Sequence, residues 1–165
     1  MAKKNTTGKK LVEKPPKAVD DCTTPPPVYD AVLAWAKQHL NITGRPIVRP
    51  FYPGGNYKRF DYPKDCIVID NPPFSIFAKI VDFYIGRGIS FLLFAPALMP
   101  IRPGCTYIGC GMPITYESGD VVNTSFVTNM LGDLICLDDT DFYTMVKEAN
   151  SPTQKQHKEA KQLWT

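Results

Sequence analysis

Apolar residues in this sequence occur either in short unbroken runs or at helical spacing, and the two patterns alternate along the middle of the chain. The run over residues 66–70 is apolar up to its final aspartate. It predicts a strand buried on both faces, because a half-exposed strand would alternate apolar and polar residues. The run over residues 89–95 predicts a second strand of this kind. Residues 74–86 lie between them and carry apolar side chains around much of a helix, which predicts a helix packed against a sheet. Strand, helix and strand in this order predict two parallel strands joined by a right-handed connection.

The segments before this unit predict one more helix and one more strand. Residues 28–40 have apolar positions three and four apart, the spacing of a helix with one buried face. Thr24 is a candidate N-cap for that helix, since hydroxyl side chains are common at the cap and prolines in the first turn. Residues 45–50 predict a short strand. Residues 51–57 predict a loop whose two glycines allow the backbone to approach a ligand closely.

The last third of the chain predicts several short strands and a helix. The strands are expected over 106–109, 113–117, 121–130 and 134–137, with a turn at 118–120 and a helix over 141–148. The expected fold class is α/β, with a mostly parallel sheet and antiparallel additions on its C-terminal side. The expected organisation is a disordered basic tail over 1–20, one α/β domain over 21–150, and a polar tail or frayed helix over 151–165.

Charge is concentrated at the N-terminus. The chain has 165 residues, enough for one domain, and a formal net charge of +3. Residues 1–17 hold six lysines against one glutamate and few apolar residues, which predicts disorder. Such a tail can add phosphate affinity, or it can act only as a solubilising segment without a partner. The rest of the chain is close to neutral, so charge alone does not argue for nucleic acid.

Cysteines and histidines give no metal or disulfide pattern. The five cysteines are irregularly spaced without a C-x-x-C pair, and the two histidines are isolated, so we expect neither a zinc site nor a disulfide framework. Five free thiols are typical of a reducing cytoplasm. The longest apolar run, near residues 89–101, is too short and too interrupted by proline to span a bilayer, so we expect no membrane partner.

The end of the strand over 66–70 carries the most specific chemistry. Ligands of α/β proteins bind at the carboxyl ends of parallel strands, and Asp70-Asn71-Pro72-Pro73-Phe74 occupies that position. Residues before a proline are biased toward extended geometry, so the Pro72 carbonyl and the Asn71 side-chain oxygen become two fixed acceptors. Phe74 adds an aromatic face. The set predicts a receptor for a planar amine, although Asn71 could instead bond its own backbone in an ordinary turn.

Asn-Pro-Pro-Phe after an apolar strand resembles the catalytic motif of DNA amino-methyltransferases that use S-adenosylmethionine. Further segments are similar to the EcoRI-type adenine methyltransferases, and the resemblance runs from about residue 22 to 135. These segments are Thr24-Pro25 before a helix, the loop from Pro50 to Gly55, Phe60-Asp61-Tyr62, and the late strand Thr124–Asn129.

The resemblance implies a reduced Rossmann-like methyltransferase sheet and methyl transfer to the exocyclic amine of adenine in DNA. It implies catalytic roles for Asn71, Pro72, Pro73 and Phe74. It implies cofactor contacts for Thr24, Pro25, Pro50, Phe51, Gly54, Gly55, Asp61 and Asp70. The expected location is the cytoplasm of a bacterium or a phage-infected host, where restriction protection and phage-borne modification are both open.

Other interpretations of these residues stay open. Thr24 can be a plain N-cap, Asp61 a solvated loop carboxylate, and residues 53–55 a surface turn. The stretch between Gly55 and Asn71 is short where the family has two further strands. This favours two alternatives: a non-catalytic nucleic-acid-binding relic of the fold, or a subunit that needs a homo-oligomer or a separate recognition partner.

Overall fold

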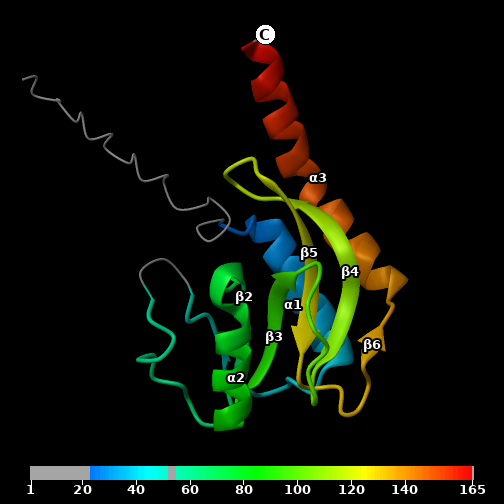
Figure 1. The fold of residues 1–165 in the computed structure, drawn as a ribbon. Coiled ribbons are helices and arrows are strands. Elements are labelled where there is room, and N and C mark those ends of the chain that lie inside the picture. Colours follow the sequence, from blue (N-terminus) through cyan, green and yellow to red (C-terminus); the bar gives the residue numbers. More distant parts are fainter. Residues whose placement is uncertain (1–22, 52–54, 165) are drawn as a thin grey trace, which may run out of the picture.

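The computed structural model describes residues 23–51 and 55–164, which form a mixed sheet covered by helices on both faces (Figure 1). The predicted basic tail over 1–20 and the loop residue Gly54 lie outside the described residues. The elements are α1 (Pro26–His39), β1 (Ile47–Val48), β2 (Ile67–Asp70), the short 3-10 helix η2 (Phe74–Ile76), α2 (Phe77–Arg87), β3 (Ser90–Pro96), β4 (Thr106–Thr115), β5 (Val121–Thr128), β6 (Cys136–Leu137) and α3 (Thr140–Leu163).

The six strands have the order β1-β2-β3-β5-β4-β6. β1, β2 and β3 are parallel, so the predicted parallel pairing of the two buried strands is confirmed. β5 lies antiparallel between β3 and β4, and β6 is parallel to β4. The α/β class with antiparallel additions is therefore confirmed. Because β5 is antiparallel to both of its neighbours, β4 runs in the same direction as β3. The carboxyl ends of β2, β3 and β4 thus share one edge of the sheet.

Two apolar clusters fill the space on either side of the sheet. One lies under α1 and α3, and its largest members include Trp35, Phe94, Phe126 and Phe142. The other lies under α2. In β2, Ile67 and Ile69 belong to the first cluster and Val68 to the second, so this strand is buried on both faces, as its unbroken apolar run predicted.

Glycine and proline explain two differences from the expected strands. The strand expected over 45–50 is paired only at Ile47–Val48, because prolines at 46 and 50 cannot donate to a sheet ladder. The two strands expected over 106–109 and 113–117 form one strand, β4. Its pairing with β5 shifts between Ile108 and Met112, where Gly109 and Gly111 have φ of 62° and 72°. These left-handed residues allow the strand to bulge and continue.

α3 is longer than the helix expected over 141–148. It continues through Pro152 to Leu163, so most of the stretch over 151–165, which was expected as a polar tail or a frayed helix, is helical. Pro152 removes one backbone donor from the helix interior. Two residues earlier, the Asn150 side chain accepts from the Thr115 N–H at 2.8 Å and donates to its carbonyl at 2.7 Å. This pair of buried hydrogen bonds holds the helix on β4 at the position where proline weakens it.

Candidate active site

The candidate site lies where β2 ends. Asp70 is the last residue of the strand, and the two prolines after Asn71 stop the ladder. Pro73 has φ of −57° and ψ of 123°, so the chain leaves the strand in an extended conformation before η2 begins at Phe74. Pro72 is buried and Phe74 is half-buried against the cluster under α1. The motif is thus rigidly anchored on its inner side.

The Asn71 side chain is hydrogen-bonded to Thr24, a residue 47 positions earlier in the chain. The Asn71 Nδ2 donates to the Thr24 Oγ1 at 3.1 Å. This bond sets the plane of the amide and turns its oxygen away from Thr24. The N-cap of α1 is Pro25, with no side-chain cap, so the interpretation of Thr24 as an N-cap is wrong. Its hydroxyl positions Asn71 instead.

Asp70 braces the site from inside. Its side chain is 2% exposed. Oδ2 accepts from the Phe51 N–H at 2.8 Å, and Oδ1 accepts from the Asn71 N–H at 2.9 Å and from Arg49 Nε at 3.3 Å. Burial raises the pKa of this carboxyl, although these donors act in the opposite direction. Both oxygens therefore hold the segment 49–51 against the end of β2.

Two residues that the sequence did not single out, Arg49 and Tyr29, add contacts around Asp70 and the end of β2. The guanidinium of Arg49 lies over the Tyr29 ring, 3.8 Å from its centroid. The Tyr29 hydroxyl donates to the Ile69 carbonyl at 2.9 Å. Burial raises the pKa of Tyr29 to about 12, so the phenol keeps the proton it donates. The only sequence signal for Arg49 was its position at the end of a short strand directly before Pro50.

The other residues predicted to contact the cofactor differ in burial. Pro25 and Pro50 are buried and Phe51 is half-buried, close to the Asp70 brace. Gly55 and Asp61 are exposed. The neighbours of Asp61 turn inward: the Phe60 and Tyr62 rings are 4.9 Å apart, and the Tyr62 hydroxyl contacts the Tyr84 hydroxyl at 2.9 Å. The structure therefore brings Thr24, Phe51, Asp70 and Asn71 together, whereas Asp61 lies on the outside of its loop.

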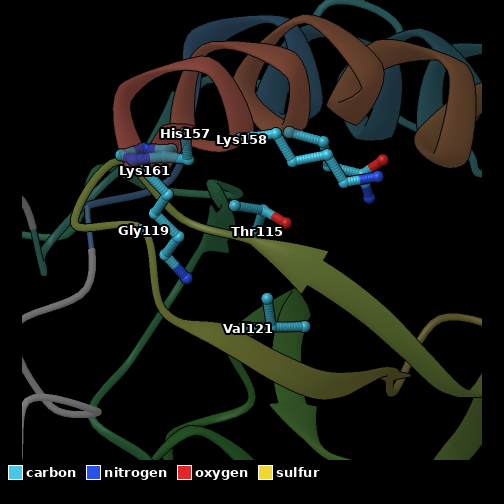
Figure 2. A pocket seen from close by; sticks show the side chains of 7 residues that line it. Thr115, Gly119, Val121, His157, Lys158 and Lys161 are labelled. Atoms are coloured by element: carbon cyan, nitrogen blue, oxygen red, sulfur yellow. The ribbon is translucent and has the colours of Figure 1, made fainter. Parts of the chain in front are cut away.

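Four cavities lined by described residues lie elsewhere. The largest two, of about 570 and 480 Å³, adjoin the end of α3 and the start of α3. A third of about 370 Å³ lies at the amino ends of β2 and β3, and a fourth of about 250 Å³ lies between the β4–β5 hairpin and α3 (Figure 2). None of these four is lined by residues 71–74.

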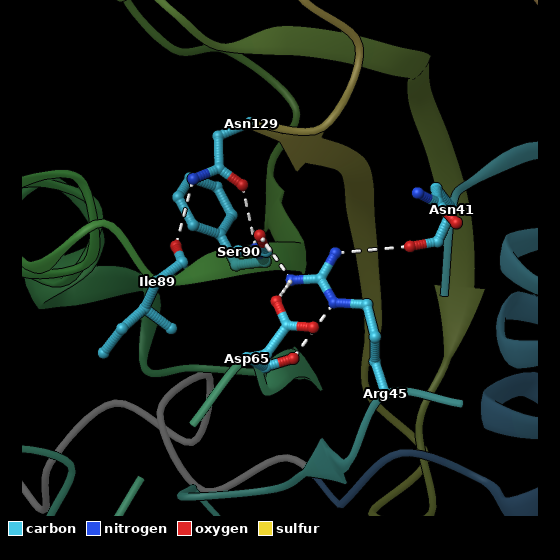
Figure 3. A network of polar contacts seen from close by, with 7 residues as sticks. Asn41, Arg45, Asp65, Ile89, Ser90 and Asn129 are labelled. Carbon is cyan, nitrogen blue, oxygen red and sulfur yellow. Dashed lines mark hydrogen bonds and ion pairs between the residues drawn. The ribbon is translucent and has the colours of Figure 1, made fainter. Parts of the chain in front are cut away.

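Asn129, which directly follows β5, has a structural role. Asn129 accepts from the Phe91 N–H at 2.9 Å and donates to the Ile89 carbonyl at 3.0 Å (Figure 3). Arg45 lies beside it, donating to Ser90 Oγ and paired with Asp65. These contacts join the residues at the amino ends of β2 and β3. Asn129 is therefore at the edge of the sheet opposite to Asn71.

The described residues show neither a metal centre nor a membrane span. No three His, Cys, Asp or Glu side chains in residues 23–51 and 55–164 gather closely enough to hold a metal ion. Within the same ranges, no helix combines the length and the apolar character needed to cross a bilayer.

Burial raises the pKa of the Cys66 and Cys105 thiols, which makes both poor nucleophiles at neutral pH.

Comparison with known proteins gives no relative: no family model matches the chain, and neither does any curated protein or solved structure.

Proposed function

We propose that this protein transfers a methyl group from S-adenosylmethionine to the exocyclic amine of adenine in DNA, on a reduced Rossmann-like methyltransferase sheet. One observation carries the proposal. The Asn71 amide is bonded to Thr24, and the adjacent Asp70 carboxylate is bonded to the Phe51 backbone. These contacts join the three segments that the resemblance assigns to catalysis and to cofactor binding.

This convergence supports the proposal because an ordinary turn does not require it. A plain strand-to-helix turn needs only hydrogen bonds between the Asn71 side chain and its own nearby backbone. In this protein the Asn71 Nδ2 reaches a threonine hydroxyl from a distant segment, in a pair that is partly buried. The sheet adds support, because parallel β1-β2-β3 followed by antiparallel β5 agrees with the expected layout.

The chemistry assigned to these residues is positioning. The lone pair of the adenine amine is delocalised into the ring, so the amine is a weak nucleophile. Asn71 Oδ1 and the Pro72 carbonyl each accept one amine hydrogen, which favours a tetrahedral nitrogen with a localised lone pair. Bound S-adenosylmethionine, which the Thr24–Pro25 and Pro50–Phe51 segments would hold, would supply its sulfonium methyl group to this nitrogen and leave as the thioether, while one amine proton would pass to water. Phe74 stacks on the base, offsetting part of the few kcal/mol needed to unstack it from the duplex.

Calorimetry and methyl transfer test the proposal together. We expect the wild-type chain to bind S-adenosylmethionine with measurable heat and to transfer labelled methyl groups to adenine-containing DNA. Asn71→Ala should lower the transfer rate by about a hundredfold or more, as for loss of one preorganised polar partner. Asn41→Ala is the matched control, because Asn41 is exposed and contributes its backbone carbonyl to the Arg45 contact.

Each result has a defined meaning. If the wild-type chain gives no heat of binding, the enzyme proposal fails. If transfer occurs but Asn71→Ala transfers at the wild-type rate, the site assignment fails.

A second candidate is a nucleic-acid-binding protein of this fold without methyl transfer, either as a relic or as one subunit of an active assembly. It is favoured by the two acidic cofactor candidates: Asp61 is exposed, and both oxygens of Asp70 are used inside the protein. Addition of a second protein from the same source that restores cofactor binding would support the subunit form of this alternative.

A further inference from the structure

We infer that the β4–β5 hairpin and the second half of α3 form a phosphate-binding surface that holds DNA beside the candidate active site. This deepens the proposed function and depends on it only for the identity of the DNA as substrate. We call this region the hairpin–helix surface and define it by residues 115–121 and 154–164.

The surface contains a cavity between two separate elements. It is an open depression of about 250 Å³, lined by hairpin residues, among them Gly119 and Val121, and by helix residues that include His157, Lys158 and Lys161. Figure 2 shows the Lys161 side chain extending from α3 along the hairpin. A second cavity, of about 570 Å³, shares Gly119, His157 and Lys161 with the first and extends to Trp164. The two cavities therefore form one continuous concave surface.

Contact between hairpin and helix depends on a glycine. Gly119 has φ of +88°, and a Cβ atom at this position would lie 2.9 Å from Nδ1 of His157. Any larger residue would force the histidine ring to move. The close approach shows that the concave surface is built by specific packing of the two elements.

Charge on this part of α3 is strongly asymmetric. Residues 154–164 carry three lysines and a histidine against one glutamate, whereas residues 140–150 carry two acidic residues and one lysine. Residues 154, 157, 158 and 161 are three or four apart, so they share one face of the helix. The hairpin itself carries two carboxylates, Glu117 and Asp120; Asp120 lines the second cavity and accepts a hydrogen bond from Ser118 Oγ at 2.9 Å. The lining of the first cavity thus includes Lys158 and Lys161 but no carboxylate, whereas Asp120 accompanies Lys161 in the lining of the second.

The second half of α3 has no role in the core. Thr153 is its last buried residue, and among residues 154–164 every described side chain is exposed or half-buried. A polar helix that extends beyond the core in this way needs another reason for its composition. Trp164 is 91% exposed, which is unusual for a tryptophan without a partner surface.

Hydrogen bonds connect this surface to the candidate active site. The Glu117 N–H donates to the Thr23 carbonyl at 3.1 Å, and the next residue, Thr24, is the acceptor for Asn71. β4 also ends at the same edge of the sheet as β2. In Figure 1 the hairpin and the start of α1 lie toward this edge, and the second half of α3 projects beyond it. DNA bound at the hairpin–helix surface would therefore pass close to Asn71.

A nucleic-acid backbone fits this chemistry. Lysine side chains neutralise backbone phosphates without reading sequence, and an exposed aromatic ring can stack on an unpaired base. A membrane surface fits less well, because an interfacial helix needs a long apolar face opposite its cations. In the second half of α3, the large apolar residues are confined to Leu163 and Trp164 at its end.

The test measures binding of a labelled DNA duplex by fluorescence anisotropy without cofactor, over a range of salt concentrations. We expect the full chain to bind and Lys158→Glu/Lys161→Glu to weaken binding about tenfold or more, with a salt slope smaller by about 2. The matched control is Lys37→Glu/Lys147→Glu, which makes the same charge change at exposed helix positions outside the surface. The control should keep most of the affinity.

A second readout uses the two tryptophans. Trp35 is fully buried and Trp164 is exposed, so quenching by acrylamide reports mainly on Trp164. Bound duplex should reduce the quenching constant of the wild-type chain, and Trp164→Phe should abolish this change.

Several results would overturn the inference: no DNA binding by the wild-type chain, equal losses in the two double variants, or tighter binding to anionic lipid vesicles than to DNA. These outcomes differ from failure of the proposed function. DNA binding through Lys158 and Lys161 without cofactor binding would leave this inference intact and overturn methyl transfer. Methyl transfer at an unchanged rate in Lys158→Glu/Lys161→Glu would leave the proposed function intact and overturn this inference.

Discussion

At the scale of single residues, Asp70 and Asp61 show how far a sequence motif determines a role. Both were candidates for cofactor contact, and the sequence left Asp61 open as a solvated loop carboxylate. The structure buries Asp70 and leaves Asp61 exposed. Asn71 and Thr24 were also both predicted as site residues, but their bond joins positions 47 apart and could not be read from local patterns. The Arg49–Tyr29 stack was missed for the same reason.

Substitution of the two aspartates should separate their roles. Asp70→Ala removes the acceptor for the Phe51 and Asn71 N–H groups, so we expect a loss of unfolding free energy of about 2 kcal/mol or more. Asp61→Ala, at an exposed position, should change it by less than about 0.5 kcal/mol. Urea unfolding followed by circular dichroism measures both. Equal effects of the two substitutions would contradict a bracing role for Asp70.

At the scale of elements, α3 continues well beyond the helix predicted over 141–148. The polar, lysine-rich composition of residues 151–165 predicted a polar tail or a frayed helix there, and Pro152 disfavours a continuous helix. The contact that overrides this preference, Asn150 with Thr115, lies between residues 35 positions apart. β4 was divided into two expected strands because its glycines suggested ends, whereas they form a bulge within one strand.

The start of α3 allows a prediction with a defined pH dependence. Asp139 accepts from the Phe142 N–H at 2.9 Å and from Trp35 Nε1 at 3.0 Å. Burial opposes ionisation of this carboxyl, but the hydrogen bonds and the nearby His39 outweigh it and lower the pKa of Asp139 below its ordinary 3.8. Because the folded state favours the ionised form, this stabilisation is full above the ordinary pKa and is lost as pH falls through the lowered one.

Asp139→Ala should therefore cost about 1–2 kcal/mol of unfolding free energy at pH 7. The difference in unfolding free energy between Asp139→Ala and wild type should become smaller as pH falls below the ordinary pKa of aspartate. Thermal or urea unfolding at a series of pH values measures this, with Asp138→Ala, an exposed neighbour, as the control. A difference that stayed constant down to the lowest pH would show that ionised Asp139 does not stabilise the helix.

At the scale of the whole molecule, the alternating pattern predicted an α/β sheet, but the order of its strands could not be predicted. Placing β5 between β3 and β4 requires two antiparallel pairings across loops, and local sequence does not encode which strand inserts. That order brings the end of β4, and with it the hairpin, to the edge that carries Asn71. The candidate site and the hairpin–helix surface are thus joined by topology, and we expect that substitutions in the hairpin–helix surface leave the core folded.

Gly119→Ala tests this separation between stability and binding. Both Gly119 and Gly44 have positive φ, of +88° and +74°, so alanine at either position should cost about 1–2 kcal/mol of backbone strain. They differ in surroundings: a Cβ at 44 meets no atom within 4 Å, whereas one at 119 would collide with His157. Gly119→Ala should therefore weaken DNA binding several-fold while its unfolding free energy matches that of Gly44→Ala. If both variants bound DNA with wild-type affinity, close packing of hairpin and helix would have no part in holding the duplex. A much larger loss of stability in Gly119→Ala would instead place the second half of α3 within the cooperative core.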